Sequence, residues 1–315
     1  MLVDKNPLVS VCVATYNSAQ YICETLDSIY NQTYKKIELV ISDDSSNDNT
    51  LEIVKEWLVG KETRFIDTQI LSVDYNTGTS ANMNRLLFAA KGTWIKGIAG
   101  DDILFPNAIE KYICYINDNS QVSWLFAKAV FYLNTFSEEC IIQSKNRLFD
   151  RYSELNSMDA SNQLKKNYLG NYYKCPTHFL KREKLLDIGG FDEEFGILED
   201  YPMWLKLLCY GEKCYFMDEF VMGYRCSNTN VSLNNEVVVN FKLSKMMYEA
   251  KKKYIFGNCP KLVKIDAIWK LKINKIFSYS LLNRNSPVLR NIHKFLIYIT
   301  LIPTVLYLKW NDSSR

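Results

Sequence analysis

Val9-Ser-Val-Cys-Val-Ala14 is a short run of β-branched and small apolar residues that leads directly into the polar loop Thr15-Tyr16-Asn17-Ser18. A run of this length and composition predicts a buried β-strand. Apolar residues at Ile22, Leu26 and Ile29 then recur at helical spacing. The chain therefore opens with a strand, a polar loop and a helix, the unit from which parallel sheets are built.

The same alternation continues through the first hundred residues. Strands are predicted over 37–41, 65–73 and 93–99, and helices over 50–58 and 80–90. Strands that alternate with helices predict an α/β fold whose sheet is covered on both faces. Open α/β sheets bind ligands at the carboxyl ends of their strands, so the loops at those ends are where a site is expected.

Polar and acidic clusters follow three of the predicted strands. They are residues 15–17, Asp43-Asp44-Ser-Ser-Asn-Asp48 and Gly100-Asp101-Asp102. Each could be a turn that also caps a helix, because Asp, Ser and Asn favour both roles. Two adjacent carboxylates at a strand end, however, repel each other unless a cation offsets their charge. The convergence predicts a ligand site, and a nucleoside diphosphate leaving group would need a divalent metal there.

A further acidic pair, Glu199-Asp200, precedes a predicted helix over 201–209. Acidic side chains are favourable near a helix N-terminus, which is one explanation of the pair. The other is a general base, since displacement at an anomeric carbon requires a carboxylate to take the proton of the attacking hydroxyl.

The composition is that of a globular protein whose main partner is not a nucleic acid. Of 315 residues, 48% are hydrophobic and 23% charged, which excludes wholesale disorder, and a net charge of +3 is too even for a nucleic-acid binder. The nine cysteines are scattered without a C-x-x-C pair, which argues against a zinc site or a disulfide framework. Only His178 and His293 occur, so any metal must rely on carboxylates, the ligands that suit Mn²⁺ or Mg²⁺.

The N-terminal residues Met1-Leu-Val-Asp-Lys-Asn-Pro7 lack the basic start and the apolar run of a secretory signal. A cytoplasmic location is therefore expected.

Taken in chain order, the motifs resemble those of family 2 glycosyltransferases, the large inverting group with the GT-A fold. The matching segments are 9–17, 38–48 (D-D-G-S-x-D, with Ser45 for glycine), 76–92 (N-x-G-x-x-x-A-R-N…A-x-G), 100–106 (D-x-D-D-x-x-x-P) and 189–200 (G-G-F-D…E-D). No single motif is specific, but the ordered set is, and it spans about residues 8–232. The resemblance implies a Rossmann-like mixed central sheet flanked by helices.

The resemblance also implies which side chains hold the nucleotide-sugar donor. Asp43 would hydrogen-bond the uracil and Tyr16 would lie against the base. Thr15 and Asn84 belong to the same donor-binding motifs, and Asp102 would help to shape the site.

For the chemistry itself, the resemblance implies a metal and a base. Asp101 would bind the Mn²⁺ or Mg²⁺ that bridges the diphosphate. Asp200 would be the catalytic base, with Glu199 positioning the acceptor or the donor sugar.

Two departures from the family pattern affect the donor site. The first Asp of D-x-D is Ala99, so metal binding rests mainly on Asp101. The usual Arg of A-R-N is Met83, and Arg85, two positions further along the predicted helix, is expected to face elsewhere.

A third departure lies in the segment 224–232, which resembles the late Y-R-x-H-x-x-x-x-S motif. Ser227 stands where His is common, which leaves Arg225 as the candidate for a contact with the diphosphate or the metal.

The C-terminal segment 295–310 is nearly all apolar, is shorter than the ~20 residues that span a bilayer, and contains Pro303. Six basic residues precede it: Lys270, Lys272, Lys275, Arg284, Arg290 and Lys294. This pattern suits a helix that lies in the interface of an anionic membrane, and equally a helix docked on the catalytic domain.

The predicted organisation is a GT-A catalytic domain over 1–235, with a nucleotide-sugar half at about 1–105 and an acceptor half at about 106–235. A helical region over 236–315, membrane-associated or docked, would follow it.

The leading functional hypothesis is transfer of one hexose, with inversion, from a UDP-sugar to a hydroxyl of a lipid-linked oligosaccharide in surface polysaccharide (O-antigen or capsule) synthesis. A metal-dependent nucleotidyltransferase would want a Gly-rich, basic phosphate loop after the first strand, which this sequence lacks. Ala99 and Met83 motivate a degenerate sugar-binding module, which the presence of Asp43, Asp101 and Asp200 weakens.

Overall fold

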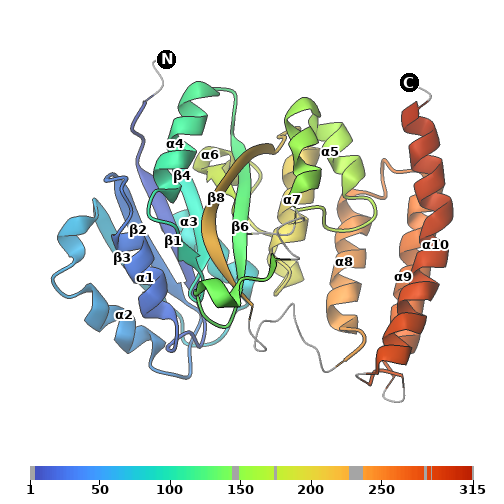
Figure 1. Cartoon of the computed structure of the whole chain (residues 1–315), viewed down its shortest axis with the longest axis horizontal. Coiled ribbons are helices and arrows are strands. Elements are labelled where there is room, and N and C mark those ends of the chain that lie inside the picture. The colour runs from blue at the N-terminus through green and yellow to red at the C-terminus, as the bar shows by residue number, and fades with distance from the viewer. Residues whose placement is uncertain are drawn as a thin grey trace.

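The computed structural model describes residues 4–143, 149–173, 176–226, 237–279, 282–284 and 286–313. Eight strands form one sheet in the order β3-β2-β1-β4-β7-β6-β8-β5 (Figure 1). The strands are β1 (Val9–Thr15), β2 (Ile37–Asp43), β3 (Asp67–Ser72), β4 (Trp94–Ala99), β5 (Ile103–Leu104), β6 (Trp124–Leu133), β7 (Phe179–Lys181) and β8 (Tyr215–Cys226).

Ten α-helices accompany the sheet within the described residues. They are α1 (Ile22–Tyr30), α2 (Thr50–Leu58), α3 (Thr79–Ala89), α4 (Ala108–Asp118), α5 (Ala160–Lys166), α6 (Arg182–Asp187), α7 (Asp200–Cys209), α8 (Phe241–Tyr254), α9 (Lys261–Phe277) and α10 (Pro287–Ser313). Short 3₁₀ turns are η1 (Glu62–Arg64), η2 (Glu138–Cys140), η4 (Asp150–Ser157) and η5 (Glu193–Phe195).

The sheet is mixed, as predicted, and its strands are parallel in the first half. β1 pairs in parallel with β2 and β4, and β2 with β3. β7 lies antiparallel between β4 and β6, β8 runs parallel to β6, and β5 is antiparallel to β8. The strands β1, β2, β4, β6 and β8 therefore end at one side of the sheet, called the carboxyl edge below.

Helices cover both faces of the sheet, which explains why β1 and β2 read as continuous apolar runs. α1 and α4 lie on one face, and α3 and α6 on the other (Figure 1). On the first face, the Trp57 indole of α2 donates to Asp27 of α1, and Gln32, just after α1, accepts from the backbone of Ile109 in α4.

Aromatic rings fill the core where the sheet turns from parallel to antiparallel. Phe179 of β7 stacks between Trp94 of β4 and Tyr112 of α4, with ring centroids 4.9 and 4.7 Å apart. On the far side of β6, Trp124 stacks on Trp204 of α7 at 5.2 Å. These contacts fix the three-residue strand β7, too short to be predicted from its own sequence, and anchor α7 against the sheet.

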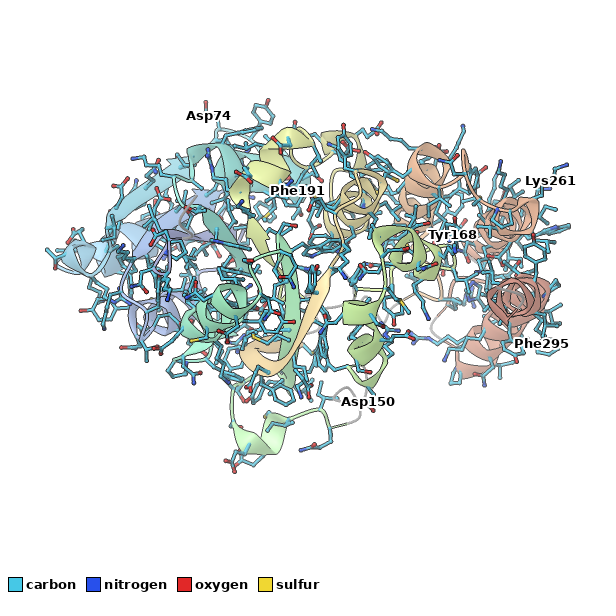
Figure 2. All side chains as sticks on the ribbon, turned by 90° about the horizontal axis from the view of Figure 1, so that it is seen from above. Asp74, Asp150, Tyr168, Phe191, Lys261 and Phe295 are labelled. Carbon is cyan, nitrogen blue, oxygen red and sulfur yellow. The ribbon has the colours of Figure 1, made fainter. Side chains whose placement is uncertain are left out.

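The C-terminal helices extend outward from α7 in sequence order. A second apolar cluster that includes Tyr201, Leu205, Ala250 and Val263 joins α7, α8 and α9. α10 packs along α9 at the end of the molecule farthest from α2 (Figures 1 and 2). The predicted helical C-terminal region is thus confirmed, and it is docked through α8 on the helix that follows the acidic pair.

Candidate active site

The loops after β1 and β2 are held together at the carboxyl edge. Thr15 and Asp43 are register partners, and the Thr15 hydroxyl donates to Asp43 Oδ1 at 2.9 Å. The Asn17 backbone N–H donates to Ser46 Oγ, and the Asn47 N–H to Asn17 Oδ1, both at 2.8 Å. Tyr16, between Thr15 and Asn17 in the chain, keeps 46% of its surface exposed and is available to a planar ligand.

Asp43 is buried and engaged by its own loop. Its carboxylate accepts from the Ser46 backbone N–H at 2.9 Å and from the Ser46 hydroxyl at 2.5 Å. Ser45, in the loop between Asp43 and Ser46, has a backbone φ of +64°. Glycine adopts this left-handed conformation at little cost, which accounts for glycine at this place in the D-D-G-S-x-D signature.

Asp44, the second acid of the pair, ties β2 to the start of α3. It accepts from the backbone N–H groups of Thr77 and Gly78 and from the Thr77 hydroxyl. The Arg85 guanidinium pairs with it at 2.6 Å. Although burial opposes ionisation, the hydrogen bonds from Thr77, Arg85 and Gly78 lower the pKa of Asp44, which is thus a fixed carboxylate.

The expectation that Arg85 faces elsewhere is wrong. α3 packs over the ends of β1 and β2, and the Arg85 side chain reaches Ser42, Thr77 and Asp44 from there. Met83 instead faces the sheet, where its terminal methyl lies against Gly97. A basic residue therefore does stand beside the Asp43-Asp44 loop, from a position that helical spacing alone did not indicate.

Asp101 and Asp102 follow β4 at the same edge. Asp102 is buried: one carboxylate oxygen, Oδ1, accepts from the Arg225 backbone N–H at 2.8 Å, and Oδ2 has no hydrogen-bond partner. Burial and the adjacent charge of Asp101 raise the pKa of Asp102 well above its ordinary value. Burial also raises the pKa of Asp101, although the Arg225 charge opposes the shift.

This pair fits a divalent cation. A buried carboxylate oxygen without a partner, beside a second carboxylate, is relieved by a positive charge. Among the described residues, no three His, Cys, Asp or Glu side chains gather as a metal cage. Mg²⁺ and Mn²⁺ sites of nucleotide enzymes typically combine one or two carboxylates with substrate phosphates, and that is the donor set which Asp101 and Asp102 offer.

Arg225 is buried beside this pair and bonded within the protein. Its Nε donates to the Asp101 carbonyl at 2.8 Å, Nη1 donates to the Asn134 carbonyl, and Nη2 pairs with Glu24 at 2.9 Å. The rings of Tyr21 and Phe136 lie 4.2 and 4.1 Å from the guanidinium carbon.

The sequence predicts that Arg225 contacts the diphosphate or the metal. In this arrangement the guanidinium instead holds the Asp101-Asp102 loop, and it is covered by the two rings. Ser227, which stands at the histidine position of the same motif, lies outside the described residues.

Asn84 is likewise engaged within the protein, although the sequence places it among the donor-binding residues. Its Nδ2 donates to the Phe191 carbonyl and to Glu193, and its Oδ1 accepts from the Phe191 N–H at 2.7 Å. Gly190 lies so close that an added Cβ would stand 2.5 Å from Asn84 Oδ1, and its φ is +68°. The two family motifs, N…A-R-N and G-G-F-D, are therefore in direct contact, through Asn84 and the backbone at Gly190 and Phe191.

The acidic pair Glu199-Asp200 stands at the start of α7, as predicted. Asp200 Oδ2 accepts from the Asn171 amide at 2.8 Å, and Oδ1 from the Tyr201 N–H at 2.5 Å. Burial, and then the charge of Asp200, raise the pKa of Glu199 to about 8. Burial raises the pKa of Asp200 too, but both of its hydrogen bonds favour the carboxylate form.

The topology brings this pair to the carboxyl edge. α7 ends at Cys209, and β8 begins at Tyr215 on the opposite edge, so α7 starts near the edge where β1, β2 and β4 end (Figure 1). The Ser80 N–H of α3 donates to the Gly196 carbonyl at 2.9 Å, which ties the segment before α7 to the helix whose preceding residues Asp44 binds.

Several residues of this network were not anticipated from the sequence: Glu24, Thr77, Asn134 and Asn171. Each has a partner that lies between 29 and 201 positions away, so no local pattern marks them. Only the positive charge of Arg85, close to a motif that lacks its usual arginine, could have signalled a site residue.

A family model described as glycosyl transferase family 2 matches residues 10–187. The chain is 28% identical to an uncharacterised glycosyltransferase, MJ1057, of Methanocaldococcus jannaschii, which covers 70% of this chain and 72% of that protein. It is 26% identical to a putative teichuronic acid biosynthesis glycosyltransferase, TuaG, of Bacillus subtilis, over 72% and 82% of the two chains.

Solved structures share the fold. TarS of S. aureus, residues 1–349 in complex with UDP-GlcNAc, has a TM-score of 0.59 at 19% identity and covers 87% of this chain and 73% of that one. The chain spans 44% of the longer TarS structure. A mannosyltransferase of Pyrobaculum calidifontis, in complex with GDP-Man and Mn²⁺, has a TM-score of 0.57 at 18% identity and covers 98% of this chain and 80% of that one. The architecture is the GT-A fold.

Proposed function

The chain belongs to glycosyl transferase family 2, and from this we propose that it is a metal-dependent, inverting hexosyltransferase that uses a UDP-sugar. The observation that carries the proposal is the carboxyl edge itself. Asp43 at the end of β2, and Asp101 and Asp102 just after β4, lie there on either side of the end of β1, and the start of α7 brings Asp200 to the same edge.

The donor would lie across the ends of β1, β2 and β4. Tyr16 supplies an exposed ring for the base, and Asp43, held by Thr15 and Ser46, an acceptor for the uracil N–H. TarS is solved with UDP-GlcNAc, which supports UDP as the carrier.

Asp101 and Asp102 would hold Mn²⁺ or Mg²⁺ through the partly exposed carboxylate of the first and the unpartnered Oδ2 of the second. The bound cation would neutralise the charge that develops on the departing diphosphate. The mannosyltransferase solved with Mn²⁺ supports this cofactor.

Asp200 would be the base. It accepts the proton of the acceptor hydroxyl while the hydroxyl oxygen forms a bond to the anomeric carbon. The bond from that carbon to the diphosphate oxygen breaks, and UDP leaves with the electron pair. Because the acceptor attacks from the face opposite the leaving group, the anomeric configuration inverts.

Glu199 supports this assignment within the pair. Burial and the neighbouring Asp200 raise the pKa of Glu199 to about 8, which favours a proton on Glu199 at neutral pH, and hydrogen bonds from the Asn171 amide and the Tyr201 N–H favour the negative charge on Asp200. A neutral Glu199 can donate a hydrogen bond to a sugar hydroxyl, which is a positioning role.

For the acceptor we propose a hydroxyl of a lipid-linked oligosaccharide in surface polysaccharide synthesis, of the O-antigen or capsule type. A relative named as a putative teichuronic acid biosynthesis glycosyltransferase supports the polysaccharide part of this proposal. Such an acceptor would keep the enzyme in the cytoplasm, peripheral to the inner face of the cell membrane.

The decisive experiment compares Asp200→Asn with Glu199→Gln. Asp200→Asn keeps the shape and removes the basicity, so kcat should fall by about 10²–10⁴-fold while UDP-sugar affinity is retained. Glu199→Gln should reduce kcat less, since the amide can still donate. If Asp200→Asn turned over normally and Glu199→Gln did not, the roles within the pair would be reversed.

A second experiment tests the metal and the alternative of a sugar-binding module. Asp101→Ala should abolish metal-dependent turnover in a folded protein, and EDTA should do the same to the unsubstituted chain. A module without catalysis would bind nucleotide sugars from a donor panel but release no UDP with any acceptor.

A further inference from the structure

Charge is divided unequally along the chain. Residues 236–315 carry 15 basic and four acidic side chains, whereas residues 1–235 carry 23 basic and 31 acidic ones. The near-neutral total therefore conceals a strongly basic helical tail on an acidic catalytic part. Such an asymmetry is typical of proteins that bind an anionic partner through one region.

The basic tail also exposes a continuous apolar stripe. On α10, six residues at alternating steps of four and three are exposed: Val288, Ile292, Phe295, Ile299, Ile302 and Leu306. This spacing places them on one face of the helix. Phe295 lies at the outer end of the molecule (Figure 2). Large apolar side chains that remain exposed along five turns mark a surface that is covered in use.

α9 adds a second exposed face with the composition of a membrane interface. Ile265, Trp269, Ile276 and Tyr279 are exposed on or just after this helix, and the Lys272 ammonium lies 5.2 Å from the Trp269 ring centroid. Trp and Tyr favour the boundary between lipid and water, and Lys can extend its charge to the headgroups.

The pairing of the two helices indicates that α10 lies along a membrane rather than across it. By length and composition, the segment Pro287–Leu308 could cross a bilayer, and little of it is buried. However, the His293 ring bonds Asn274 Oδ1 at 2.7 Å, and the Thr304 hydroxyl lies at 3.4 Å from the Leu262 carbonyl, so α10 follows α9 antiparallel.

α9 has lysines at 261, 264, 270, 272 and 275. Charges in the bilayer core are costly. Because α10 is paired with α9, α10 could not enter the core without bringing the α9 lysines with it.

Charge also distinguishes lipid from a second copy of the chain. Pairing two α10 stripes would bring together two regions that each have an excess of 11 positive charges. An anionic lipid surface, in contrast, attracts exposed Lys272, Lys275, Arg284 and Lys294 while it accepts the apolar stripe.

We infer that the α9–α10 hairpin is an in-plane docking surface for a membrane rich in anionic lipid. The apolar stripe of α10 enters the headgroup boundary, and the cations of α9 and of the turn before α10 bind the headgroups. This attachment does not depend on which sugar or acceptor the active site uses, and it can be measured without turnover.

The test uses the full chain and sedimentation with vesicles. Binding is expected to phosphatidylcholine vesicles that contain phosphatidylglycerol, not to pure phosphatidylcholine, and it should weaken as salt rises. Each lysine near such a surface contributes about 1 kcal/mol, so Lys272→Ala/Lys275→Ala should weaken binding about thirtyfold. Lys35→Ala/Lys36→Ala, two exposed lysines before β2, is the matched control and should change nothing.

A second variant tests the apolar stripe. Phe295→Ser/Ile299→Ser should release the protein from anionic vesicles, with Ile66→Ser, an exposed isoleucine outside the tail, as its control. Turnover on a short soluble acceptor should persist. Vesicle binding that survives both tail variants would overturn the inference. The inference would also be overturned if the wild-type chain did not bind vesicles and instead sedimented as a dimer, and if Phe295→Ser/Ile299→Ser dissociated that dimer.

Discussion

Replacing Arg225 by lysine separates two roles for this residue, a direct contact with the donor and a hold on the acidic pair. Lysine retains the charge but not the three directed contacts of the guanidinium with the Asp101 carbonyl, the Asn134 carbonyl and Glu24. It can reach one of them, and it fills the space between the rings of Tyr21 and Phe136 less well.

The magnitude follows from which contacts are lost. A hydrogen bond from a charged donor contributes about 1.5–3 kcal/mol when buried, so losing one carbonyl bond should lower the free energy of unfolding by about that amount. The Glu24 carboxylate is half exposed, and its share should be about 0–1 kcal/mol. Because Arg225 supports side chains that would hold the metal, Mn²⁺ affinity should fall by about 10–100-fold.

The assay is urea unfolding together with calorimetric titration of Mn²⁺ in the presence of UDP, and of UDP in EDTA. For Arg225→Lys we expect lower stability, weaker Mn²⁺ binding and an unchanged metal-free affinity for UDP. Glu24→Gln is the control, with both quantities near the wild-type values. The reasoning is refuted if Arg225→Lys binds Mn²⁺ normally but loses metal-free UDP binding, because that result belongs to a direct contact with the diphosphate.

Three further changes have defined outcomes. Glu199 binds its proton more tightly in the folded chain, with a pKa of about 8, than in the unfolded chain, so wild-type stability should fall relative to Glu199→Gln as pH rises from about 4.5 to 8; equal pH profiles in urea unfolding would contradict this. Gly190→Ala should lower the free energy of unfolding more than Gly189→Ala. Both glycines have φ near +70°, but only the added Cβ at Gly190 would clash with Asn84 Oδ1; equal losses would argue against the close contact between Gly190 and Asn84. Ser45→Gly should raise the thermal midpoint slightly, since it removes a left-handed serine that costs about 1 kcal/mol; a lower midpoint would show that the loop gains nothing from glycine.

Local pattern was sufficient for the elements that bear the site. β1, β2 and β4 and the helices α2, α3 and α7 begin and end within two residues of their predicted bounds. Hydrophobic periodicity carries this information because burial of one face is a property of neighbouring residues. The order of the motifs was equally sufficient for the family, since each short motif follows a strand or begins a helix.

What the sequence by itself determined is therefore the succession of strands and helices, the acids at their ends and the family. The tertiary structure decided which of the polar residues are available to a ligand. Asn84 meets Phe191 and Arg225 meets Glu24 across 107 and 201 positions, and the short strand β7 pairs with β4 and β6 where Trp94 and Tyr112 stack on Phe179. A hydrogen-bond partner is set by proximity in space, and no local periodicity encodes a contact between segments so far apart in the chain.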